Sequence, residues 1–124
     1  MSVILSALIV GTAPLPATME ACSLVEVIDG DTIRCDDEVM ELYGTKAPMF
    51  EDDPTCMYAR MPEWCDNYLA ERSRDKLSAF LARGIPKVYP MGTDRFGVPQ
   101  VRILIGFVDA GKYLVRNGLG RDIR

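Results

Sequence analysis

Two carboxylates separated by one glycine, Asp29 and Asp31, are the residues of this chain whose type and spacing best suit chemistry. They follow an apolar run that ends at Ile28 and precede the β-rich pair Thr32-Ile33, so we expect them in a tight strand–turn–strand bend. Carboxylate oxygens suit hard cations such as calcium or magnesium. Aspartate is also typical of turns, where its side chain accepts hydrogen bonds from nearby backbone N–H groups. From the residues alone, a cation site and ordinary turn chemistry both stay open.

The overall charge is acidic. The chain has 18 Asp and Glu against 14 Lys and Arg, a net charge of −4, and nine acids against two bases lie between residues 29 and 53. Proteins that hold nucleic acid by bulk electrostatics usually carry a basic excess, so the composition disfavours that class of partner. The sequence has no histidine, which excludes histidine acid–base catalysis and histidine metal ligands.

The elements that would position these residues follow from periodicity and turn signals. We expect an antiparallel meander over 22–29, 32–35 and 38–43, a long loop over 44–62, and a helix from Glu63 or Asp66 to Arg83 that Gly84 ends as its C′ residue. Strands over 87–89 and 98–105, a loop over 90–97 and a short helix over 109–117, ended by Gly118, complete the pattern. This order predicts an α+β, mainly β fold, a five-stranded antiparallel barrel of OB type with one long and one short helix.

The chain length suits one domain with its own core, which we expect over residues 22–124. Residues 1–21 read as an apolar segment and a connector, either derived from a signal peptide or used as an extra strand. The apolar run over 3–10 is too short to span a membrane, so no membrane span is expected.

The four cysteines favour disulfides. They are Cys22, Cys35, Cys56 and Cys65, with spacings unlike those of C-x-x-C zinc sites. An even number in a small domain indicates an oxidising compartment, periplasmic or extracellular. Of the three possible connectivities we favour Cys22–Cys35, which flanks the strand–turn–strand, with Cys56–Cys65, which would tie the long loop to the start of the helix. Four reduced, buried thiols are the alternative.

Four blocks in order resemble the signature of the staphylococcal-nuclease-like family, the thermonucleases. The blocks are Ile28-Asp29-Gly30-Asp31-Thr32, Leu42-Tyr43-Gly44 with Ala47-Pro48, Asp94-Arg95-Phe96-Gly97, and Leu114-Val115-Arg116-Asn117-Gly118-Leu119. The resemblance covers about residues 22–119 and implies an OB fold that cleaves nucleic acid with calcium. In such a site carboxylates hold the ion, a glutamate acts on the attacking water and two arginines stabilise the phosphate in the transition state.

The resemblance assigns these roles one position at a time. The first metal carboxylate is Asp31, the second metal position is Lys46, the glutamate position is Met49, the two arginine positions are Glu41 and Val98, and the phosphate-binding pair is Arg95 and Phe96. Only the first metal carboxylate and Arg95 keep the family's chemistry, since Phe96 lacks the tyrosine hydroxyl.

Charge is inverted at two of these positions. Glu41 would place negative charge where a phosphate binds, and Lys46 would place positive charge where a cation binds. Two unit charges about 4 Å apart interact with about 4 kcal/mol at an effective dielectric constant near 20. Unless Glu41 and Lys46 pair with each other as a structural ion pair, both repel the family's ligands. We therefore expect no appreciable nuclease activity by the family mechanism.

The expected function is a nuclease-like OB protein, a pseudoenzyme that is periplasmic or secreted and serves as a binding or interaction module for a protein or ligand. No cofactor is expected, and nucleic acid is possible by resemblance but disfavoured by charge. One alternative is an active calcium-dependent nuclease on DNA or RNA, with Glu51, Asp52 and Asp53 joining Asp31 as a relocated carboxylate cluster. A solvated acidic loop is the favoured interpretation of these three residues. Another alternative is a purely structural domain of a larger assembly.

Overall fold

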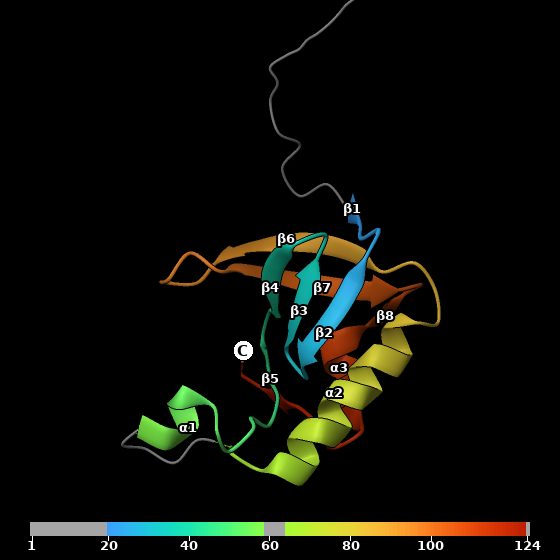
Figure 1. Cartoon of the computed structure of the whole chain (residues 1–124). Helices are drawn as coiled ribbons and strands as arrows, with labels where there is room; N and C mark the ends of the chain where they lie inside the picture. The colour runs from blue at the N-terminus through green and yellow to red at the C-terminus, as the bar shows by residue number, and fades with distance from the viewer. Residues whose placement is uncertain (1–19, 59–63, 124) are drawn as a thin grey trace, which may run out of the picture.

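The computed structural model describes residues 20–58 and 64–123, and Figure 1 shows its ribbon. The expected apolar segment over residues 1–19 and the earlier of the two expected helix starts, residue 63, lie outside the described residues. The two residues at the end of the expected connector form a short strand, β1 (Glu20–Ala21), which pairs with a strand from the second half of the chain.

The main sheet is mixed. Its strand order is β1-β6-β7-β4-β3-β2, and β8 pairs with β7. These strands are β2 (Val25–Asp29), β3 (Thr32–Cys35), β4 (Glu38–Leu42), β6 (Lys87–Thr93), β7 (Pro99–Ile105) and β8 (Val108–Asp109). The expected meander is confirmed, because β2 pairs with β3 and β3 with β4, both antiparallel.

The expected antiparallel, five-stranded arrangement is wrong in strand number and in strand direction, because the main sheet of the described residues has seven strands and contains a parallel pair. Strands β4 and β7 pair in parallel, with Glu41 opposite Gln100 and Leu42 opposite Val101. This pairing joins the two halves of the chain, and it could not follow from sequence-adjacent hairpins. Within residues 20–58 and 64–123 no strand pairing closes the sheet into a barrel, so β1 and β2 remain its two ends. The coarser description holds: an α+β fold made mainly of strands.

Helix α2 (Asn67–Leu81) packs on the sheet where β2 lies (Figure 1). The helix begins after Asp66, whose carboxylate accepts a hydrogen bond from the Leu69 N–H at 2.9 Å and so caps the N-terminus. Its buried residues recur at helical spacing and match the predicted stripe: Ala70, Ser73, Leu77, Phe80 and Leu81. Gly84 does not act as a left-handed C′ residue; the helix ends at Ala82, whose backbone is right-handed.

The other differences concern short elements. The expected loop over 44–62 contains β5 (Thr45–Lys46) and α1 (Pro54–Tyr58), and β6 continues to Thr93 through the expected loop over 90–97. The second helix of the prediction is α3 (Ala110–Arg116), followed by Gly118 with a φ of 73° as its expected stop. After it, β9 (Arg121–Asp122) pairs with β5. The described part of the chain therefore has three helices instead of two.

The core lies between α2, α3 and one face of the main sheet. Its largest fully buried side chains come from these elements and the segment after β5: Phe80, Ile33, Leu77, Ile103, Leu114, Pro48 and Ser73. Phe80 stacks on Tyr113 of α3 with ring centroids 4.5 Å apart. None of the helices in the described ranges is long and apolar enough to cross a membrane.

Candidate functional site

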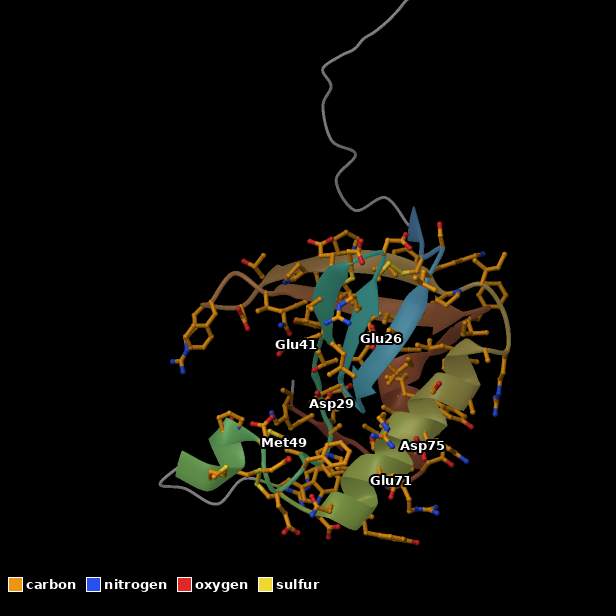
Figure 2. The ribbon with its side chains drawn as sticks, viewed as in Figure 1. Glu26, Asp29, Glu41, Met49, Glu71 and Asp75 are labelled. Atoms are coloured by element: carbon orange, nitrogen blue, oxygen red, sulfur yellow. A yellow bond between two sulfur atoms is a disulfide. The ribbon has the colours of Figure 1, made fainter. Side chains whose placement is uncertain are left out.

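The turn between β2 and β3 holds both carboxylates of the first motif. The backbone N–H of Asp31 donates to Asp29 Oδ1 at 3.1 Å, which is the local hydrogen bond that favours aspartate in turns. The β2–β3 register also shifts between Val27 and Asp29, so the strand carries a bulge just before the turn. Asp29 thus has a structural role that needs no cation (Figure 2).

Gly30 allows this turn to lie directly against α2. A Cβ on Gly30 would sit 1.9 Å from Ser73 Oγ and 2.7 Å from Ala47 Cβ, so no side chain fits there. Ser73 is fully buried and its hydroxyl donates to the Leu119 carbonyl at 2.8 Å. The turn, α2 and the segment after α3 are therefore fixed against one another at this point.

Asp31 points its carboxylate at the chain after β5. Its Oδ2 accepts a hydrogen bond from the Ala47 N–H at 2.9 Å, and its Oδ1 accepts one from the Thr32 hydroxyl at 3.1 Å. Burial raises the pKa of Asp31 to about 7, and the neighbouring Asp29 carboxyl adds to this rise, while the Ala47 N–H and the charge of Lys46 oppose it. Burial thus favours the neutral form of the Asp31 carboxyl over the carboxylate, compared with an exposed aspartate.

A small cavity of about 130 Å³ adjoins this carboxylate. It is lined by Asp31, Glu41, Leu42, Thr45, Lys46, Gln100 and Ile123. The turn before β3 and strands β4, β5 and β7 each contribute, so the parallel β4–β7 pairing is what assembles the site. Glu41 and Lys46, the two positions where the resemblance implies inverted charge, thus lie with Asp31 around one cavity.

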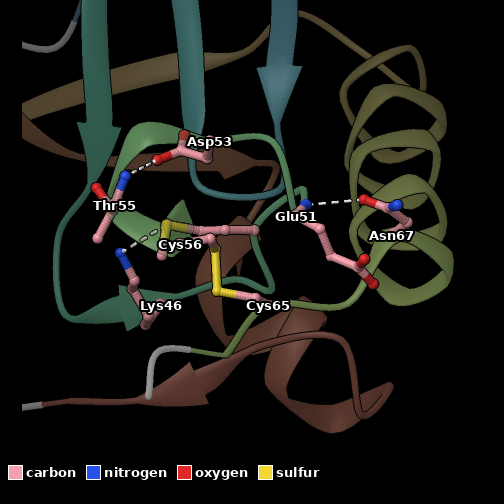
Figure 3. Close-up of a disulfide and its surroundings, with 8 residues drawn as sticks. Lys46, Glu51, Asp53, Thr55, Cys56, Cys65 and Asn67 are labelled. Atoms are coloured by element: carbon pink, nitrogen blue, oxygen red, sulfur yellow. Dashed lines mark hydrogen bonds between the residues drawn. A yellow bond between two sulfur atoms is a disulfide. The ribbon is translucent and has the colours of Figure 1, made fainter. Parts of the chain in front are cut away.

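Glu41 and Lys46 do not pair with each other. Glu41 Oε1 accepts a hydrogen bond from Gln100 Nε2 at 2.8 Å. The Lys46 ammonium approaches Met49 Sδ at 3.8 Å, a weak contact drawn in Figure 3. Among the described residues no ion pair joins these two side chains, so the structural ion pair offered as an alternative is not formed. The Lys46 and Glu41 side chains therefore lie beside the cavity without pairing with each other.

Met49 and Val98, at the glutamate and second arginine positions, are not among the residues that line this cavity. Met49 is buried, and its backbone exchanges hydrogen bonds with the start of α2: its N–H donates to the Trp64 carbonyl and its carbonyl accepts from the Asp66 N–H. Val98 belongs to the β6–β7 connection, where its N–H donates to Asp94 Oδ1 at 2.9 Å. Neither residue lines the cavity beside Asp31. The glutamate and second arginine positions thus carry side chains with no acid–base or anion-binding group.

Arg95 and Phe96 form the exposed tip of the β6–β7 connection. The Arg95 guanidinium carbon lies 4.9 Å from the centre of the Phe96 ring, and 77% of Phe96 is exposed. The two predicted ligand-binding residues therefore touch each other, but they do not line the cavity that holds Asp31. Asp94 fixes this tip by accepting the Phe96 N–H at 2.8 Å.

The relocated carboxylate cluster is not formed. Glu51 and Asp52 line a different and larger hollow of about 610 Å³ beside α2, with Phe50, Met57, Asn67, Glu71 and Arg74. Asp53 accepts the Thr55 N–H and so caps the start of α1 (Figure 3). In the described ranges no three His, Cys, Asp or Glu side chains lie close enough together to hold one metal ion. Asp31 consequently has no relocated partners.

Both predicted disulfides are confirmed. Cys22 is bonded to Cys35 and Cys56 to Cys65, and no cysteine is free. The first bond is buried at the open end of the β2–β3 hairpin, and the second joins α1 to the residue before Asp66 (Figure 3). Two disulfides in so small a domain are compatible with an extracellular or periplasmic location.

Comparison with known proteins adds no family. No family model matches the chain, and no curated protein matches it.

The cavity also contains residues that the sequence motifs did not indicate, chiefly Gln100 and Thr45. Alternation along 98–105 does place Gln100 on the face opposite the core residue Val101, but only the non-local pairing with β4 reveals that this face meets Glu41.

Proposed function

We propose that this protein is a nuclease-like OB domain that has lost calcium-dependent phosphodiester hydrolysis and serves as an exported binding or interaction module. The observation that carries the proposal is the gathering of Glu41, Lys46 and Asp31 around one cavity. Glu41 and Lys46 stand at the positions to which the resemblance assigns groups that bind a phosphate and a cation, and their inverted charges support the loss of both ligands.

The electrostatics of this cavity oppose the family's metal. A divalent cation would meet the Lys46 ammonium, and repulsion between close charges amounts to several kcal/mol in a partly buried site. Its remaining carboxylate ligands would be Glu41 and Asp31, and the raised pKa of Asp31 means that calcium must displace a proton from it at neutral pH. Calcium usually takes six to eight oxygen ligands, which two carboxylates supply only in part.

The chemistry of hydrolysis lacks its anion-stabilising groups. Glu41 stands at the first arginine position and would repel a phosphate, and Val98 stands at the second and lies outside the cavity. Loss of a single transition-state donor costs about two to three orders of magnitude in rate, and here both are replaced. Met49, at the glutamate position, is buried, and its thioether cannot act as a base on a water molecule.

The chain order of the elements supports the OB part of the proposal. An OB fold is a partly open, five-stranded Greek-key barrel. Here a three-stranded antiparallel meander, a helix and two further strands follow in that order, and the parallel β4–β7 pairing curls the second half back beside the first. The two disulfides support export, since such bonds persist in oxidising compartments.

The cavity itself is too small to be the main binding surface of a module. Its 130 Å³ compares with about 300–1,000 Å³ for ordinary small-molecule sites, so the partner must bind elsewhere, on the outer surface or in the hollow of about 610 Å³ beside α2. The acidic chain disfavours nucleic acid as that partner at physiological salt. A protein or a small ligand fits the proposal better.

Incubation of the disulfide-bonded protein with single-stranded DNA tests the loss of activity. We expect no cleavage that depends on calcium, with EDTA as the metal-free control, and no difference between wild type and Asp31→Ala. Calcium-dependent cleavage that disappears in Asp31→Ala would instead establish an active nuclease. Fluorescence anisotropy with the same DNA at physiological salt should show no binding, in line with the charge.

A further inference from the structure

Two neighbouring turns at one end of the molecule expose large apolar side chains that the core does not use. Phe107 is 102% exposed and Ile85 is 68% exposed. Phe107 lies in the turn between β7 and β8, and Ile85 lies in the connection between α2 and β6. Solitary exposed apolar residues are ordinary on protein surfaces, but several that gather at one end call for a partner.

The backbone holds Phe107 outward. Gly106 has a φ of 61° and precedes Phe107 in a two-residue turn, the arrangement of a type II′ hairpin with glycine at its first central position. Ile105 and Val108 pair across this turn, so it is anchored in the sheet. The aromatic ring therefore stands at the end of a rigid hairpin, where it costs little conformational entropy to bury.

The two turns form one continuous surface. A Cβ on Gly84 would lie 3.4 Å from Ile105 Cγ2, so the connection that carries Ile85 rests on the end of β7. Figure 1 shows this connection beside β8, on the right of the view. We call this surface the apolar tip and define it as Ile85, Ile105, Phe107 and Val108.

Three exposed cationic residues lie within a few positions of the apolar tip along the chain. Arg83 and Lys87 lie two residues before and after Ile85, and Lys112 lies in the first turn of the helix that follows β8; all three are exposed. The ion pairs among the described residues include none of them. Asp109, the acid next to Val108, is buried. Within residues 83–87 and 106–112 the exposed charges are therefore these three cations. The Arg83 guanidinium also donates to the Tyr113 hydroxyl at 2.8 Å, and the acidic residue Glu20 pairs with Val88 in the neighbouring strand.

We propose that the apolar tip and its three cations bind the surface of an anionic lipid bilayer. The shape of the apolar tip favours a bilayer over a protein pocket, because its two most exposed residues, Phe107 and Ile85, protrude on separate turns instead of lining a groove. Aromatic and aliphatic side chains would enter the interface while Arg83, Lys87 and Lys112 meet the lipid phosphates. The surface lies at the far end of β7 from Gln100 and its cavity, so the inference does not rest on the proposed function.

Co-sedimentation with vesicles tests this inference. The disulfide-bonded protein should bind phosphatidylglycerol-containing vesicles at low salt and should not bind phosphatidylcholine vesicles. Phe107→Ser should weaken binding about tenfold, since a buried aromatic side chain contributes most of the apolar area. The matched control is Phe96→Ser, which removes another largely exposed phenylalanine, beside Arg95 in the β6–β7 connection, and should leave binding unchanged.

Removal of single charges completes the test. Lys87→Gln and Lys112→Gln should each weaken binding about fivefold, and added salt should release the protein. Absence of binding to anionic vesicles, or equal binding by wild type and Phe107→Ser, would overturn the proposal. So would a dimer in analytical ultracentrifugation that Phe107→Ser dissociates while the protein ignores vesicles, because the apolar tip would then contact a second copy of the chain.

Discussion

Position 30 requires glycine because a side chain would clash with its neighbours, not because its backbone is left-handed. Its α-carbon faces Ser73 and Ala47 so closely that Gly30→Ala must push α2 away from the β2–β3 turn. Overpacking of this kind costs about 1–3 kcal/mol, and we expect a loss of unfolding free energy near the upper end because Ser73 is itself fully buried.

Urea unfolding followed by circular dichroism measures this loss. The matched control is Gly84→Ala, where the new methyl group would meet only Ile105 at 3.4 Å and the backbone is not left-handed. That control should change stability by less than about 1 kcal/mol. Equal effects of the two substitutions would mean that the turn does not press on α2 as closely as described.

The raised pKa of Asp31 makes stability depend on pH. Because the folded protein holds this proton up to about pH 7 and the unfolded chain releases it near 3.8, unfolding releases a proton between these values. Stability therefore falls as pH rises through this window and levels off above it. Asp31→Asn removes the effect, and its amide can still accept from the Ala47 N–H.

Unfolding free energies of wild type and Asp31→Asn from pH 4 to 8 check this. At pH 8 the variant should be more stable by on the order of 2 kcal/mol, less than the full shift implies because Asp31 is only partly buried. Near pH 4 the two proteins should converge. Asp75→Asn, at an exposed carboxylate on α2, is the control and should track wild type. A wild-type stability that rises between pH 4 and 7 would contradict the assignment.

At the scale of elements, the two disulfides differ in access to solvent. Cys22 and Cys35 are 7% and 9% exposed, whereas Cys56 and Cys65 are only half-buried. A thiol reductant must reach a sulfur to attack it, so mild reduction should open Cys56–Cys65 first. Alkylation followed by mass spectrometry of the native protein should label Cys56 and Cys65 well before the other pair.

The variant Cys56→Ser with Cys65→Ser should lose about 2–3 kcal/mol of unfolding free energy, the usual contribution of a short closed loop. The matched variant at Cys22 and Cys35 should lose more, because it also leaves buried hydroxyls in the core. Simultaneous labelling of all four cysteines in the native protein would contradict the order of access.

Local signals predicted most of the elements. The meander, the start of α2 after Asp66 and the stop at Gly118 follow from alternation, capping and glycine, which act over a few residues. Strands β5, β8 and β9 have two residues each, which is too few to show the alternation of apolar and polar residues that predicts a strand. The parallel contact of Glu41 with Gln100 joins residues 59 positions apart in the sequence, so no local pattern could indicate it.

At the scale of the whole molecule, the cavity beside Asp31 exists only because four separate segments meet. Motif positions predicted that residues 31, 41 and 46 belong together, and the folded chain places all three on one cavity. The motifs could not predict which groups these side chains contact. Glu41 accepts a hydrogen bond from Gln100, and the Lys46 ammonium contacts the Met49 sulfur. The two charges are thus held in place by contacts that are specific to this chain.

This arrangement predicts that one substitution should create a cation site. Lys46→Asp removes the ammonium and leaves three carboxylates around a cavity of about 130 Å³, which suits a hydrated calcium ion. The ion should bind the folded state alone and stabilise it by about 2–3 kcal/mol at a concentration a hundred times its dissociation constant. Binding should weaken below pH 7, where Asp31 holds its proton.

Thermal unfolding with calcium or with EDTA measures the effect, and a rise in Tm of several degrees is expected for Lys46→Asp alone. Lys46→Gln is the control, since it removes the positive charge without adding a ligand, and wild type should not respond. The variant should still fail to cleave DNA, because residues 41 and 98 provide no cation for the phosphate. If calcium leaves the Tm of Lys46→Asp unchanged, Lys46 does not prevent calcium binding in the wild type. The inverted charges would then not explain a loss of nuclease activity.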